Sequence, residues 1–202
     1  MKRIVLLFLF TVSIAAYGQK LGFGVRLGDP SGLTLKKYFS KNALEISVGR
    51  TYMFYGRGWY DHRFNDWYER QKYDYEDFQY MDYHSSVPIG VQVHYLFNNS
   101  INKIGDDAIT GLNWYYGFGG QLRFQNYTYD FKYKIHGDNN WYYEKNKQVN
   151  NIDLGGDGVI GLEYTFDKAP LSIFLDITLF MEVVDDPFLF HFQSGLGCRY
   201  NF

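Results

Sequence analysis

Three residues near the C-terminal end of the chain, Glu182, His191 and Ser194, are of the types that carry out hydrolysis or acyl transfer. A serine hydroxyl becomes a good nucleophile when a histidine accepts its proton and a carboxylate orients that histidine. Apolar and polar residues alternate through this part of the chain, so successive side chains point to opposite faces. Glu182 and His191 fall on one face and Ser194 on the other. The three side chains should therefore not converge, and the sequence predicts that the protein is not an enzyme.

Charged residues occupy the polar positions of the alternating segments, and we expect them to share an enclosed interior. An isolated buried charge is costly, so the cations and anions should form ion pairs that close this interior. Asp176 and Glu163 are expected as diagonal neighbours on two paired strands, and two carboxylates this close can hold one proton between them. An ion or proton path is therefore the alternative to a closed network. The expected network consists of Arg26, Lys36, Glu45, Arg123, Asp153, Asp157, Glu163, Asp176, Glu182 and Arg199.

The histidines and the glycine-rich run of the chain predict no metal or cofactor site. His62, His84 and His136 lack the spacing of metal ligands. Residues 155–158 have neither the lysine of a phosphate-binding loop nor the carboxylates of a calcium-binding loop. We therefore expect no bound metal ion and no cofactor.

Apolar residues recur at every second position in segment after segment, which is the period of a β-strand. Turn residues separate most of these segments, and no stretch has a convincing helical pattern. The sequence therefore predicts an all-β fold, an eight-stranded antiparallel up-and-down barrel. The expected strands are residues 21–28, 33–38, 44–49, 87–97, 114–124, 160–166, 173–182 and 190–202.

Two connections are much longer than the others, residues 53–85 and residues 126–150. They follow the third and the fifth expected strands, so both should lie on the side opposite the chain ends. Alternation continues through residues 127–135, and residues 136–139 have the composition of a turn. The fifth and sixth strands should therefore extend beyond the barrel as a hairpin.

Length, charge and the N-terminal residues limit the class of protein. A chain of 202 residues has the length of one domain, and a net charge of −2 argues against a nucleic-acid binder. No run of about 18 apolar residues is present, which excludes a helical membrane protein. Residues 1–18 combine two cations, a short apolar stretch and small residues before the expected cut, as a secretory signal peptide does. We expect cleavage before Gln19 and one domain over residues 19–202.

A secreted barrel can be soluble or can span a membrane, and two patterns favour the membrane. The polar positions are rich in glycine, which weakens a solvent-facing sheet but leaves room for larger side chains inside a narrow barrel. Aromatic residues such as Trp114 and Tyr200 gather at the strand ends, whereas Ile, Val and Leu fill the middles. Such girdles flank the lipid-facing band of a transmembrane barrel, and the two long loops should then be extracellular.

Residues 19–202 resemble the small eight-stranded outer-membrane β-barrels of Gram-negative bacteria, of the OmpX and OmpA-membrane-domain kind. The run from Gly24 to Lys36 looks like the first hairpin of an uncharacterised subgroup of these barrels. The last five residues are similar to the C-terminal aromatic signal that the outer-membrane assembly machinery reads, with Tyr200 and Phe202 as its aromatic residues. The resemblance implies a location in the cell outer membrane, among its lipid and lipopolysaccharide. It implies no particular ligand.

The long loops are the expected contact surface of the protein. Aromatic residues make up 13 of the 32 residues from Tyr52 to Tyr83, and such rings suit recognition of sugars, peptides or a protein partner. The alternative is that these rings pack on one another and on the lipopolysaccharide interface. A lipid-A-modifying barrel enzyme and a small-solute channel remain the rival functions. The loop contact candidates are Trp59, Tyr60, Trp67, Tyr68, Tyr73, Tyr75, Trp141 and Tyr142.

Overall fold

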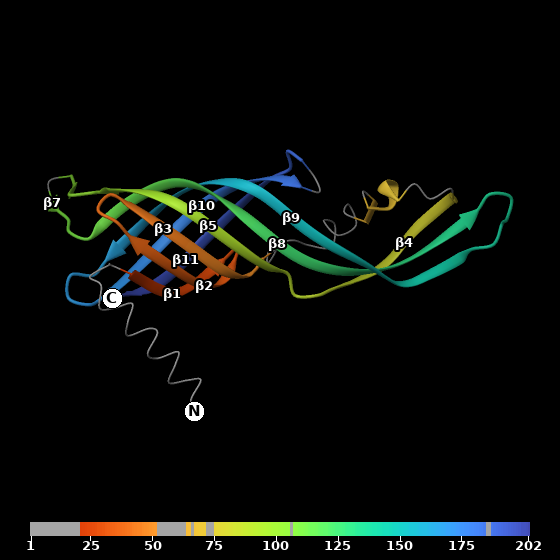
Figure 1. The fold of residues 1–202 in the computed structure, drawn as a ribbon, viewed down its shortest axis with the longest axis horizontal. Coiled ribbons are helices and arrows are strands. Elements are labelled where there is room, and N and C mark those ends of the chain that lie inside the picture. The colour runs from red at the N-terminus through yellow and green to blue at the C-terminus, as the bar shows by residue number, and fades with distance from the viewer. Residues whose placement is uncertain (1–20, 52–63, 66, 72–74, 106, 185–186) are drawn as a thin grey trace, which may run out of the picture.

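The computed structural model describes residues 21–51, 64–65, 67–71, 75–105, 107–184 and 187–202. The expected signal peptide lies outside the described residues, as do Trp59, Tyr60 and Tyr73 of the first long loop. The described part is nearly all antiparallel β-sheet (Figure 1). Its strands are β1 (Leu21–Gly28), β2 (Ser31–Tyr38), β3 (Asn42–Arg50), β4 (Tyr75–Ser85), β5 (Ile89–Ser100), β6 (Lys103–Ile104), β7 (Asp107–Ala108), β8 (Leu112–Ile135), β9 (Tyr142–Thr165), β10 (Leu171–Val184) and β11 (Phe190–Asn201).

Eight of these strands form a closed ring. The order around the ring is β1, β2, β3, β5, β8, β9, β10 and β11, and β11 pairs with β1 to close it. Every neighbouring pair is antiparallel. Each expected strand corresponds to one strand of the ring, so the prediction of an all-β chain with eight antiparallel strands is confirmed.

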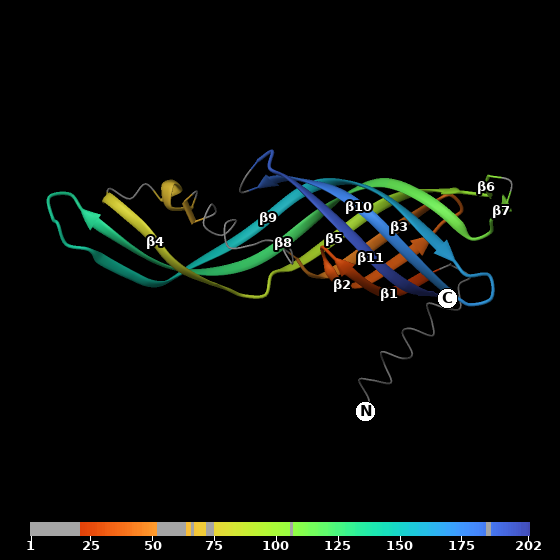
Figure 2. The same ribbon diagram turned by 180° about the vertical axis from the view of Figure 1, so that it is seen from behind.

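Strands β8 and β9 are each 24 residues long and run well past the ring. They form the predicted hairpin, whose turn follows Ile135, and the hairpin projects away from the side of the ring where the C-terminal end lies (Figures 1 and 2). We call the side with Leu21 and Asn201 the terminal side of the ring, and the other the hairpin side.

Strand β4 is a correction to the prediction, which treated residues 53–85 as one loop. β4 pairs with the far half of β8, over residues 127–135, whereas β5 pairs with the half inside the ring. The two strands are separated at residues 86–88, where Pro88 lacks the N–H that a ladder needs. β4, residues 127–135 of β8 and residues 142–149 of β9 thus form a three-stranded sheet, which we call the extension. Short helical pieces at residues 64–65 and 67–70 also contradict the expectation of no helix.

Bulges interrupt the outer strands of the extension. The register of β4 against β8 shifts between Tyr75 and Asp77 and again between Tyr80 and Asp82. The register of β9 shifts opposite Tyr129 and Phe131, where Asn146 adopts a positive φ of 58°. Asn tolerates this conformation, and its backbone N–H donates to Asp130 Oδ1 at 2.8 Å. Each bulge adds one unpaired residue to an edge strand of the extension.

The two faces of the ring have opposite character. Polar and charged side chains point into the ring and are buried, whereas large apolar side chains of the same strands point outward and are exposed. On β10, for example, Asp176 and Thr178 are buried while Leu175 and Ile177 are each more than half exposed. Within the described residues, no helix has the length and apolar character needed to cross a membrane.

Candidate functional site

The interior of the ring holds ion pairs that connect strands which are not neighbours. Arg26 on β1 reaches across β11 to Asp176 on β10, and both guanidinium N–O distances are 2.6 Å. Tyr115 on β8 also donates to Asp176, at 3.2 Å. Two parallel, charge-assisted hydrogen bonds between a guanidinium and a carboxylate are stronger than hydrogen bonds between neutral groups. This pair therefore ties three separate parts of the ring together.

Glu163 on β9 is the second centre of the network on the terminal side. It accepts from Lys36 Nζ at 2.6 Å and from Arg199 Nη1 at 3.0 Å, and the Tyr38 hydroxyl also donates to it. Arg199 in turn lies 2.7 Å from Glu45. Each buried carboxylate here thus has at least one cation within ion-pair distance, which offsets the cost of desolvating it.

Glycines provide the space for these large buried groups. A Cβ atom added to Gly195 would lie 2.1 Å from the Arg26 guanidinium carbon, and one added to Gly197 would lie 2.4 Å from the ring of Phe174. The Arg199 guanidinium stacks over that same Phe174 ring at 3.6 Å. The residue at position 195 or 197 must therefore be small for arginine and phenylalanine to fill the interior.

On the hairpin side, the interior polar groups include neutral amides. Gln121 donates to Asp157 at 2.6 Å and to Gln193 at 2.7 Å, and it accepts from Arg123 at 2.8 Å. His94 Nε2 lies 3.1 Å from the other oxygen of Asp157. Gln121, Gln193 and His94 were not among the predicted site residues. Each of them occupies a polar position of an alternating strand, on the inward face, and that position was the signal that could have identified them.

The remaining charges of this half lie at the rim of the ring. Arg123 stacks over the Phe180 ring at 4.2 Å, and Asn151 donates to Asp153 at 2.6 Å. All ten predicted network residues are buried. Asp176 and Glu163 are diagonal neighbours in the register of β9 and β10, but each has its own cation partner.

Glu182, His191 and Ser194 do not come together as a catalytic site. His191 Nε2 lies 3.8 Å from Glu182 Oε2 inside the ring, while Ser194 is exposed on the outer face of β11. The described residues also contain no group of three or more His, Cys, Asp or Glu side chains that could hold a metal ion.

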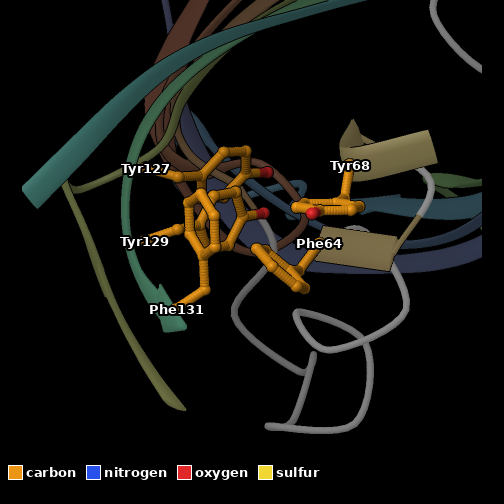
Figure 3. Close-up of a cluster of buried hydrophobic side chains, with 5 residues drawn as sticks. All are labelled: Phe64, Tyr68, Tyr127, Tyr129 and Phe131. Atoms are coloured by element: carbon orange, nitrogen blue, oxygen red, sulfur yellow. The ribbon is translucent and has the colours of Figure 1, made fainter. Parts of the chain in front are cut away.

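The extension has a hydrophobic core of its own, made of aromatic rings (Figure 3). Phe64 and Tyr68 of the helical segment face Tyr127, Tyr129 and Phe131 of β8, and all five are buried. Phe64 is fully buried, with its ring centroid 5.1 Å from that of Tyr129 and 5.5 Å from that of Phe131. The helical segment thus covers one face of the three-stranded sheet, which continues the inward face of β8.

The loop contact candidates have different positions. Tyr68 is 5% exposed, and its ring centroid lies 3.9 Å from that of Phe78. Tyr68 is therefore a core residue, and its prediction as a contact residue of the surface is wrong. Trp67 packs at the edge of the same core. Tyr75 begins β4, while Trp141 lies half-buried near the hairpin turn, beneath Lys132 at 4.6 Å and Lys134 at 4.8 Å.

Tyr142, the last contact candidate, is exposed at the hairpin end and donates to Asp138 Oδ2 at 2.6 Å. This bond lowers the pKa of the Asp138 carboxyl, and the backbone N–H of Asn140 contributes to the same shift. It raises the pKa of the Tyr142 hydroxyl.

Two cavities lie on the two sides of the ring. One, of about 460 Å³, lies on the terminal side and reaches Glu163 and Asn201. The other, of about 280 Å³, lies where the helical segment meets β8 and β9. It is lined by Trp67, Arg70, Gln71, Tyr127, Tyr129, Val149, Asn150 and Asn151.

No family model matches this chain, and no curated protein matches its sequence.

Proposed function

We propose that the ring is a transmembrane β-barrel of the cell outer membrane, without enzymatic activity, with a closed polar lumen and an extracellular extension that makes surface contacts. One observation carries this proposal, which is the reversed polarity of the ring. Arg26, Arg123 and Arg199 are each 1% exposed. Leu27, Phe118 and Phe192, on the outer face, are 67%, 61% and 79% exposed.

This polarity suits a hydrocarbon environment. Soluble proteins rarely expose continuous apolar surfaces of more than a few hundred Å², and here the outer faces of β1 and β10 are apolar along their length. Lipid cannot hydrogen-bond to the backbone, so a spanning sheet must close on itself. A ring with all eight strand pairs formed meets that requirement.

Aromatic side chains on the terminal side support the same proposal. Phe97 stacks with Tyr116 at 5.3 Å, and Trp114 stacks with Tyr116 at 5.5 Å. Tyr200 and Phe202 contact each other at 5.0 Å on the far side of the ring. Amphipathic rings prefer the boundary between lipid and water, where they would meet lipid headgroups or lipopolysaccharide.

The position of the extension supports its extracellular orientation. Outer-membrane barrels have short periplasmic turns and longer extracellular loops. In this chain, the short connections at residues 39–41 and 166–170 lie on the terminal side, and the extension rises from the other side.

The lumen is proposed to be closed because its charges are paired across it. An ion would have to displace the Arg199 guanidinium, which stacks on Phe174 and pairs with Glu163, and the Arg123 guanidinium, which stacks on Phe180 and donates to Gln121. Eight-stranded barrels are just wide enough for side chains to fill. We therefore expect no conductance in planar bilayers.

Cell fractionation and gel mobility test this proposal. The protein should sediment with outer membranes, and the folded form should migrate differently from the boiled form on a detergent gel. Recovery in the soluble periplasmic fraction without detergent would overturn the membrane assignment. Mass spectrometry of lipid A from cells with and without the protein should show no difference, and a changed acyl pattern would overturn the non-enzymatic assignment.

A further inference from the structure

The connection between β10 and β11 carries large apolar side chains that are exposed. It lies on the hairpin side of the ring, because β10 begins on the terminal side at Leu171 (Figure 1). Val183 and Val184, at the end of β10, are 54% and 46% exposed, and Phe188 and Phe190, on the returning chain, are 76% and 55% exposed. Apolar side chains gathered in this way mark a contact surface. We call the described residues 183–184 and 187–190 the β10–β11 turn.

Phe188 occupies a backbone position that suits glycine. Its φ is 70°, a conformation that bulky residues rarely adopt. The Phe188 N–H donates to the Glu182 carbonyl at 2.9 Å, and the Glu182 N–H donates to the Leu189 carbonyl at 2.9 Å. Two residues thus face one, which is a β-bulge of the kind whose first residue is usually glycine. Because the phenyl group is mostly exposed, packing within the described part of the chain does not explain a phenylalanine here.

The apolar outer face of the ring continues into this turn. Phe192 is opposite Leu179 and Phe190 is opposite Met181 in the register of β10 and β11, and Phe192 is 79% exposed. The proposed function assigns this outer face to lipid, and Phe188 follows directly beyond it along the chain. Continuity with a lipid-facing surface favours lipid acyl chains as the occupant, because they already surround the neighbouring side chains in that proposal.

Two aspartates limit how deep the turn can lie in a membrane. Asp185 and Asp186 belong to the same connection and lie outside the described residues. A carboxylate at the centre of a bilayer is costly, so this connection must remain close to water or to lipid headgroups. The exposed phenyl groups instead gain free energy by leaving water. The boundary between acyl chains and headgroups satisfies both requirements.

We propose that Phe188 anchors the β10–β11 turn in the outer edge of the acyl-chain layer of the surrounding membrane. The inference rests on the proposed function, because only a ring that spans the membrane brings the turn to this depth. It extends that function by assigning to lipid a turn on the side from which the extension projects. The anchor would also fix the height of the membrane surface relative to the extension.

The test uses NMR of the full chain from residue 19 onward, folded in nanodiscs of dimyristoylphosphatidylcholine. One sample contains phosphatidylcholine with a nitroxide near the headgroup end of its acyl chain, and another contains a gadolinium chelate in the water. The Phe188 amide signal should be lost with the nitroxide lipid and retained with the chelate. Leu175 is the reference for lipid and Tyr143, exposed on the extension, is the reference for water.

Two variants test the phenyl group itself. Phe188→Asn should move the amide of this position from lipid to water while keeping the fold, because asparagine tolerates a positive φ. Phe188→Leu is the matched control and should retain lipid contact, since leucine is also apolar. The heat-dependent gel shift checks the folding of both.

Three results would overturn the inference. They are access of the chelate to the Phe188 amide in the parent protein, protection of this amide from both agents, which would indicate contact with protein, and equal lipid contact in the parent and Phe188→Asn. In each case, loss of the Leu175 signal with the nitroxide lipid would leave the proposed function standing. Access of the chelate to Leu175 would overturn the proposed function as well.

Discussion

Arg26 and Asp176 form a two-bond ion pair that crosses β11, the last strand, and joins β1 to β10. The space for this pair exists because Gly195 of β11 has no side chain beneath the guanidinium. The pair therefore spans the position where the first and last strands of the ring meet. It stabilises the contact between β1 and the C-terminal strands, which are far apart in sequence.

Replacing Arg26 by methionine should destabilise the ring strongly. Asp176 would then be a buried carboxylate without its principal cation, and breaking such a pair costs about 3–5 kcal/mol. The double variant Arg26→Met with Asp176→Leu should recover much of this loss, because no buried charge remains. Urea unfolding in detergent micelles measures both. A single variant as stable as the parent protein would contradict the assigned role of the pair.

A charge on the outer face should be costly in the middle of a strand and tolerated near its end. Leu175→Arg should cost about 2–4 kcal/mol if this position is at the bilayer midplane, whereas arginine near an interface costs about 0–1 kcal/mol. Leu171→Arg is the matched control, since Leu171 has the same orientation on β10 and lies at the terminal side. Folding into lipid vesicles measures the difference. Equal effects of the two variants would argue against a membrane around β10.

Phe64→Ala should loosen the extension without opening the ring. Phe64 is fully buried among six other aromatic rings, and removing such a side chain costs about 3–5 kcal/mol. Hydrogen exchange followed by mass spectrometry should show faster exchange in β4 and unchanged exchange in β1 and β2. Faster exchange throughout the ring would show that the two parts unfold as one unit.

Replacing residues 59–82 by a short Gly/Ser linker should leave the ring folded. This change removes the helical segment and most of β4, but the eight ring strands keep their hydrogen-bonded neighbours. The entropic cost of closing a surface loop also changes only slowly with the length of the loop. The heat-dependent gel shift should persist. A protease should then cleave next to Tyr127, Tyr129 and Phe131, because the segment that covers them has been removed. Loss of the gel shift would mean that the extension is needed to complete the ring.

The hairpin end should respond to acidic pH through Asp138. Its pKa is lowered by the bond from Tyr142, so ionised Asp138 stabilises the turn above the ordinary aspartate pKa. This contribution is lost as the pH falls through the lowered pKa of the folded state. Tyr142→Phe should return the Asp138 pKa toward its ordinary value, as measured by NMR of the carboxyl carbon. Tyr143→Phe is the control, and an unchanged pKa in Tyr142→Phe would disprove the stated cause.

The sequence was sufficient to predict the ring strands because apolar residues recur at nearly every second position of each. The same period assigns Arg26 and Asp176 to one face. Their pairing could not be predicted, since it depends on the registers of β1 and β10 against β11. Cavities and cation–ring contacts depend on the same registers and were equally out of reach.

Strand β4 was missed for a local reason. Its two bulges add one residue each near Tyr75 and Tyr80, which breaks the alternation of its aromatic residues. The helical segment did carry a signal, because Phe64, Trp67 and Tyr68 have the i, i+3, i+4 spacing of a helix face. That spacing was hidden by the many other aromatic residues of the same region.

The bulges of β4 and β9 have a consequence for how copies of this chain behave when crowded together. The ring has no free edge, but among the described residues no strand pairs with the outer edges of β4 and the far half of β9, and unpaired edges of this kind template another strand. Irregular register at Tyr80, and at Asn146 where Asp130 occupies the backbone N–H, prevents a straight ladder from continuing onto a neighbouring molecule. Lys145 and Lys147 add like charges to the β9 edge. The extension can therefore keep a large aromatic core without growing into fibrils.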